Sequence, residues 1–64
     1  MFEFADQSIQ SFVNRNTYVD LDVIWMVDNI VVGRDVLPSL DKNGDKVVIV
    51  TSPVAVKQVV ELVR

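Results

Sequence analysis

The sequence lacks the two residue types that supply thiolate and imidazole chemistry, because none of its 64 residues is a cysteine or a histidine. Without cysteine there is no disulfide, thiolate nucleophile or thiolate zinc site, and without histidine there is no imidazole base or metal ligand. Catalytic triads that use a histidine base are therefore excluded. We predict that the chain is not an enzyme, that it has no catalytic residues, and that it holds no metal or cofactor.

The features of a secreted or membrane protein are also missing. The longest apolar run, Val23–Val27, is far shorter than the roughly 20 residues of a membrane-spanning helix. The N-terminus has no basic segment followed by an apolar one, as a secretory signal has. The absence of cysteine fits a reducing compartment. We therefore expect a cytoplasmic protein that makes no membrane contact.

Positive charge is scarce, since six Lys and Arg residues stand against nine Asp and Glu residues and give a net charge of −3. Sequence-independent binding of nucleic acid requires clustered Lys and Arg residues, so nucleic acid is not an expected partner. Acidic residues predominate before Gly33 and basic residues after it. This asymmetry would orient a charged partner or a second copy of the chain. An ordinary solvated surface also accounts for it.

Apolar bulk is what the chain has in abundance, because half of its residues are hydrophobic and valine supplies a large share of them. This proportion is typical of a chain that folds. Sixty-four residues suffice for one domain, so we predict a single α+β domain over 1–64. A chain of this size buries only about 60% of the surface that it exposes when unfolded, so its stability alone is marginal.

The clearest elements lie in the C-terminal part. The β-branched segment Lys46–Thr51 predicts a strand. Ser52 is suited to cap a helix and Pro53 to occupy its first turn. The apolar residues of Val54–Arg64 fill one wide helical face, which predicts a C-terminal helix. Before the strand, the Asn-Gly pair within Lys42–Asp45 predicts a β-hairpin.

The other two segments differ in clarity. Ala5, Ile9, Phe12 and Val13 recur at helical spacing, which predicts a short N-terminal helix over Glu3–Arg15 with these residues on its buried side. In residues 20–32, alternation and β-branched composition favour strands with a turn at Asp28–Asn29, whereas Asp20 as a cap and Gly33 as a stop favour a helix. We favour strands, which gives a small one-sheet αβββα domain with antiparallel hairpins. The helical alternative gives ααββα.

Two or three helices leave much of the apolar surface of such a small domain uncovered. Pairing of sheet edges or helix faces between copies would bury the surplus, so we expect a homodimer or a small closed oligomer. A compact monomer with a well-filled core is the alternative. The candidate partner-binding residues are large apolar side chains of the central part, namely Tyr18, Trp25 and Met26. Trp25 also fits the role of a core anchor.

A second candidate site would take an anionic ligand. Thr51 and Ser52 stand where the free amide groups and the dipole of the predicted C-terminal helix would attract a phosphate or a carboxylate. Arg34, in a predicted loop, and Lys57 add positive charge. Ordinary helix capping is the alternative role for Ser52, and the glycine-rich loop of a P-loop is absent.

The sequence therefore predicts a small non-enzymatic protein-interaction module. We expect an accessory or inhibitory protein of a phage or bacterium, which acts as a homo-oligomer by binding a protein partner. The alternative is a small protein that binds an anionic ligand or nucleotide at an oligomer interface.

Overall fold

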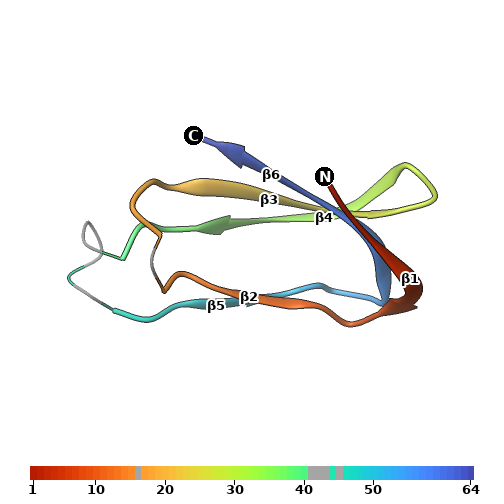
Figure 1. The fold of residues 1–64 in the computed structure, drawn as a ribbon, viewed down its shortest axis with the longest axis horizontal. Helices are drawn as coiled ribbons and strands as arrows, with labels where there is room; N and C mark the ends of the chain where they lie inside the picture. The colour runs from red at the N-terminus through yellow and green to blue at the C-terminus, as the bar shows by residue number, and fades with distance from the viewer. Residues whose placement is uncertain (16, 41–43, 45) are drawn as a thin grey trace.

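The computed structural model describes residues 1–15, 17–40, 44 and 46–64. These residues form six β-strands, and no helix occurs among them. The strands, each antiparallel to its neighbours, are β1 (Phe2–Ser8), β2 (Ser11–Val13), β3 (Leu21–Val27), β4 (Ile30–Leu37), β5 (Ile49–Thr51) and β6 (Val56–Val63). The described part is therefore a small all-β domain (Figure 1), and the predicted α+β class, whether αβββα or ααββα, is wrong.

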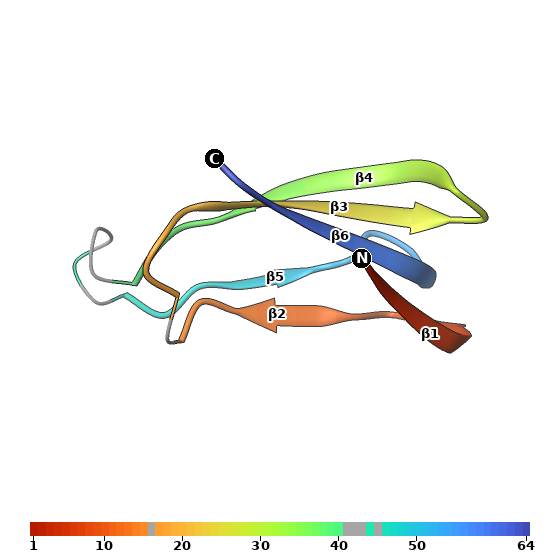
Figure 2. The same cartoon turned by 45° about the horizontal axis from the view of Figure 1, so that its top comes forward.

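The strands form two layers. One sheet has four strands in the order β1-β6-β3-β4, and the other has two strands, β2 and β5. The smaller sheet lies against one face of the larger one, as the tilted view of Figure 2 also shows. We call the face of the larger sheet that looks toward β2 and β5 the inner face, and the opposite face the outer face.

Two bent strands run through both layers. Only Ile9 and Gln10 separate β1 from β2, and residues 52–55 separate β5 from β6. Because β1 pairs with β6 and β2 with β5, the two bent strands stay neighbours on both sides of the corner. At the corner the Ser52 amide donates to the Gln10 carbonyl at 2.8 Å, and the Gln10 amide donates to Ser52 Oγ at 3.0 Å. Ser52 thus completes a strand corner, and its predicted role as a helix cap is wrong.

The N-terminal segment is extended where a helix over Glu3–Arg15 was expected. Ile9 and Val13, which the helical spacing placed on the buried side, are 57% and 40% exposed. Phe4 and Phe12 pack against the core, whereas Phe2 is 51% exposed. Phe2 lies opposite Val59 of β6, and its ring centroid is 6.2 Å from that of Phe12 in β2. Pairing with β6, which is distant in sequence, therefore overrides the local helical pattern.

The predicted helix over Val54–Arg64 is also a strand. β6 is a central strand of the larger sheet, with β1 on one side and β3 on the other. Five of its eight residues are apolar and they lie on both faces of the sheet, so the sequence lacks the strict alternation of a strand with one solvated face. Such a run resembles a wide helical face when it is read alone. The β-branched valines, whose side chains are stiff, fit the extended backbone better.

The middle of the chain is extended, as the favoured interpretation of residues 20–32 predicted. β3 and β4 form a hairpin that pairs Leu21 with Leu37 and Val27 with Ile30. The turn is at Asp28–Asn29, which have φ values of 50° and 65°. Short polar side chains are the ones that most readily adopt such angles after glycine. The predicted strand and turn are confirmed here.

The segment between β4 and β5 is only partly described. Three of the four residues of the predicted hairpin at Lys42–Asp45, namely 42, 43 and 45, lie outside the described residues. The strand predicted over Lys46–Thr51 is confirmed only as β5. Since β4 and β5 belong to different sheets, the chain between them crosses from one layer to the other.

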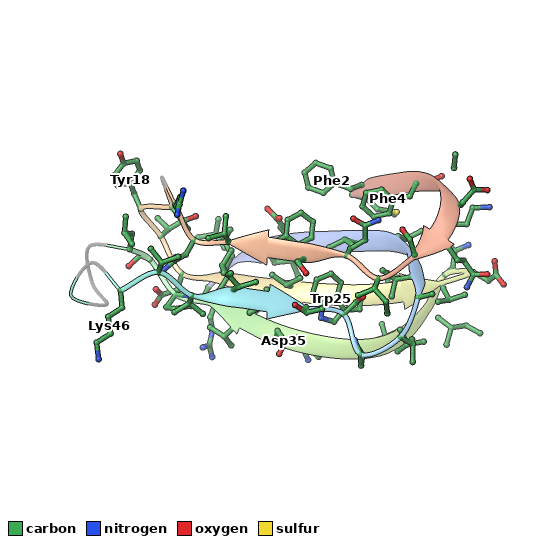
Figure 3. All side chains as sticks on the ribbon, turned by 90° about the horizontal axis from the view of Figure 1, so that it is seen from below. Phe2, Phe4, Tyr18, Trp25, Asp35 and Lys46 are labelled. Atoms are coloured by element: carbon green, nitrogen blue, oxygen red, sulfur yellow. The ribbon has the colours of Figure 1, made fainter. Side chains whose placement is uncertain are left out.

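The core lies between the layers, around Trp25 (Figure 3). Its indole ring stacks on Phe12 of β2 with 5.7 Å between centroids, which joins the two sheets. The buried apolar side chains of this core are Val23, Trp25, Leu37, Val50, Val56 and Val59.

A buried amide, Asn14, closes one end of the core. Its Nδ2 donates to the carbonyl oxygens of Pro38 at 3.2 Å and Lys46 at 3.0 Å. Its Oδ1 accepts from the Val48 amide at 2.8 Å. These bonds satisfy the amide and tie together the segment after β2, the segment after β4 and the segment before β5.

Candidate functional site

The outer face of the larger sheet is the candidate site, and the strand registers define which residues form it. Val23 and Trp25 point into the core, so the alternating residues Ile24 and Met26 point outward. Rows of cross-strand neighbours extend from these positions. Each row is given in the strand order β4, β3, β6. The first row is Val36, Asp22 and Leu62, and the second is Arg34, Ile24 and Val60. The third row is Val31, Met26 and Gln58, and it continues to Glu3 on β1.

This face is apolar where an antiparallel sheet that faces water is normally polar. Six of its ten residues are apolar. Leu62 is 49% exposed and Val36 is 43% exposed, while Ile24 and Val60 between them are half-buried by their neighbours. β2 and β5 lie on the other side of the sheet, and no described element covers the outer face (Figure 2). The described fold therefore buries only one of the two apolar faces of its larger sheet.

A groove at one end of the outer face carries the charges of Asp22, Arg34 and Arg64. It has a volume of about 460 Å³ and is lined by Asp22, Arg34, Asp35, Val36 and Arg64. Arg64 Nε lies 3.3 Å from Asp22 Oδ1, so this pair is neutralised. Asp35 accepts a hydrogen bond of 2.7 Å from Trp25 Nε1. The Arg34 side chain forms no hydrogen bond or ion pair with any described residue, so its planar guanidinium donors are available to a carboxylate or phosphate.

The opposite end of the face is fixed by a pair of amides. The Asn29 amide donates to Gln58 Oε1 at 2.8 Å, and Gln58 Nε2 donates to Asn29 Oδ1 at 3.0 Å. The turn between β3 and β4 is thereby held against β6. Gln58 is 9% exposed, and these two bonds satisfy its buried amide group.

The residues predicted to bind an anion do not come together. Arg34 is on β4 of the larger sheet, whereas Thr51 is on β5 of the smaller one. Thr51 Oγ1 lies 3.0 Å from Ser11 Oγ, and Ser52 is buried at the corner. Lys57 is exposed near the start of β6 and does not belong to the outer-face rows. Of these four residues, Arg34 alone lines the groove.

The residues predicted to bind a partner are also separated. Trp25 is fully buried, so its side chain serves the core, as the alternative interpretation held. Tyr18 is 71% exposed and lies in the segment before β3, at one end of the molecule, where Figure 3 labels it. Met26 is on the outer face, half-buried, in the third row.

Sequence reasoning missed most of the outer face, notably Ile24, Val60 and Leu62. The signal for Ile24 was the unbroken apolar run Val23–Val27. Such a run is typical of a strand whose two faces are both covered. The signal for Val60 and Leu62 was hidden because their segment was assigned to a helix.

The described residues contain no group of three or more acidic side chains that could hold a metal ion. They also contain no helix that is long and apolar enough to cross a membrane.

Comparison with protein-family models, with curated proteins and with solved structures found no match to this chain.

Proposed function

We propose that the chain is a non-enzymatic protein-interaction module that works as a homo-oligomer and makes its contact through the outer face. The observation that carries this proposal is the apolar composition of that face around Ile24 and Val60. Contiguous apolar patches on small proteins mark sites of interaction, because leaving them in water costs about 25 cal/mol for each Å² of apolar surface.

The size of the face fits a modest interface. A strand of seven residues is about 23 Å long, and four strands spaced by about 4.8 Å cover about 19 Å, so the face projects to about 440 Å². A standard stable interface buries about 800 Å² on each partner. The total accessible surface of the described chain is 4210 Å². A contact through the outer face alone therefore belongs to the smaller interfaces, and its assembly should depend on protein concentration.

Sedimentation velocity over a range of protein concentrations tests the proposal. The wild-type protein is expected to shift from a smaller to a larger species as concentration rises. Val36→Lys, on the outer face, should keep the smaller species at every concentration. Ile49→Lys is the matched control, because Ile49 is an exposed β-branched residue on β5 of the other sheet. If the wild-type protein sediments as a monomer at all concentrations, the proposal is wrong.

A second candidate is the binding of a small anion in the groove, favoured by the unpaired Arg34 beside Arg64. Arginine guanidinium groups bind carboxylates and phosphates through parallel hydrogen bonds. Inorganic phosphate should then raise the melting temperature of the wild type and leave that of Arg34→Ala unchanged. An equal response of both proteins would remove this candidate.

A further inference from the structure

We infer that a second copy of this chain covers the outer face, with the two-fold axis parallel to the strands, so that Arg34 of each copy pairs with Glu3 of the other. This inference rests on the proposed function and specifies its partner and geometry. The inference is based on two charged side chains without ion-pair partners at opposite edges of the face, and on the apolar side chains between them. A two-fold axis parallel to the strands brings the opposite charges of two copies together.

The two charges are Glu3 on β1 and Arg34 on β4, the edge strands of the larger sheet. Glu3 lies opposite Gln58, and Arg34 lies opposite Ile24, so both side chains belong to the outer face. Both are exposed, and neither forms an ion pair with a described residue. Three strand spacings, about 14 Å, separate the two edges, which is too far for a pair within one chain.

The symmetry of a dimer brings the opposite edges together. A two-fold axis that lies in the interface and runs parallel to the strands places β4 of one copy over β1 of the other, and β3 over β6. Arg34 then lies over β1 of the second copy, the strand that carries Glu3. Glu3 is one row away, about 7 Å along the strand, an offset that an extended arginine side chain spans.

The other in-plane axis is disfavoured by charge. An axis perpendicular to the strands places β4 over β4 and β1 over β1. The Arg34 edges would then face each other, and so would the Glu3 edges. Like charges across an interface oppose association, whereas complementary ones favour it.

The apolar centre is self-complementary under the same parallel axis. Ile24 and Val60 are direct neighbours on the two central strands, so they lie at the same level. When β3 of one copy lies over β6 of the other, Ile24 of each copy packs on Val60 of the other, as in an aligned sandwich. The Asp22 side chain at the end of the face is already paired with Arg64.

Cysteine cross-linking tests this geometry, because the sequence has no cysteine of its own. In the double variant Glu3→Cys, Arg34→Cys, the two positions of one chain lie about 16 Å apart, whereas facing sheets about 10 Å apart with an offset of about 7 Å bring the thiols of the two copies within about 10 Å. That distance is too long for a disulfide, but a bis-maleimide reagent that spans about 10 Å should give a covalent dimer on a denaturing gel. Arg34→Cys alone should give little dimer under the same conditions. Efficient cross-linking of Arg34→Cys alone would overturn the parallel axis in favour of the perpendicular one.

Charge reversal gives an independent measure. Arg34→Glu should weaken the dimer about tenfold in dissociation constant, and adding Glu3→Arg should restore the affinity. Lys57→Glu is the control for charge alone, since Lys57 lies outside the outer-face rows, and it should change the constant little.

The outcomes separate this inference from the proposed function. If sedimentation shows a dimer but neither the cysteine pair nor the charge swap responds, the geometry is wrong and the interaction module stands. If the protein is a monomer throughout, both fail.

Discussion

The two faces of the larger sheet are made of the same kinds of residues and have different surroundings. Val23 and Trp25 on the inner face are fully buried, whereas Ile24 and Met26, which alternate with them along β3, are only half-buried. The inner face is covered by β2 and β5, and no described element covers the outer one. The central strands thus have the composition of strands buried on both faces. The difference teaches that the apolar composition of a face does not tell whether the chain itself supplies a layer that covers it.

Among substitutions that test this difference between the faces, the largest loss of stability is expected on the inner face. Trp25→Ala removes the ring that stacks on Phe12 and should cost about 3–5 kcal/mol of the free energy of unfolding. A domain of this size has only about 3–10 kcal/mol in total, so the variant should be largely unfolded. Met26→Ala on the outer face should cost far less. Urea denaturation followed by circular dichroism at low protein concentration measures both. Equal losses would break the comparison.

The next effect concerns a polar residue that belongs to the interior. Asn14→Ala removes three side-chain hydrogen bonds, each worth about 1 kcal/mol, so we expect a loss of about 3 kcal/mol. Gln7→Ala, an exposed amide on β1, is the control and should change stability by less than about 0.5 kcal/mol. The same denaturation experiment compares them, and a loss at Asn14 no larger than at Gln7 would contradict the role given to Asn14.

A smaller effect is expected where the corner between β5 and β6 touches the inner face. A Cβ atom at Gly33 would lie 2.8 Å from Pro53 Cγ, and the proline ring cannot turn away. Gly33→Ala should therefore cost about 1–3 kcal/mol. Thermal unfolding of this variant, of Pro53→Ala and of the double variant forms a cycle. Pro53→Ala should recover part of the loss, and strict additivity of the two changes would argue against the contact.

The smallest effect on folding is expected on the outer face. Val36→Thr keeps the shape of the side chain at a position that is 43% exposed, and it should change the stability of the isolated chain by less than about 0.5 kcal/mol. It should nevertheless reduce the rise in melting temperature with protein concentration that an associating protein shows. Scanning calorimetry at several concentrations measures this rise. An unchanged concentration dependence would show that Val36 lies outside the contact.

Part of the fold could be predicted from the sequence because it depends on neighbouring residues. The turn at Asp28–Asn29 and the strands beside it rest on local composition, and both were predicted correctly. Ser52 and Pro53 were correctly read as a boundary, because they interrupt a β-branched run. They gave no information on the type of the next element, since the same pair suits a helix start and a strand corner.

The two helix predictions were wrong because strand pairing with distant parts of the chain, which a local sequence pattern does not show, decides the structure of these segments. Whether Val56–Val63 is a helix or a strand depends on β1 and β3, which flank it and come from distant parts of the sequence. The candidate site shares this dependence. Arg34 and Met26 were named from the sequence as members of different sites, and only the register of β3 with β4 places both on one face.

The pairing of the two bent strands has a consequence for how the chain reaches its native state. β1 and β2, at the start of the chain, find their partners in β6 and β5, near its end, so neither layer is complete until these distant segments meet. Closing so long a loop before either layer is complete makes folding slow, on the scale of milliseconds to seconds for such topologies. During synthesis the N-terminal strands must wait for the C-terminal ones to leave the ribosome. In that interval their apolar side chains are exposed to non-native contacts.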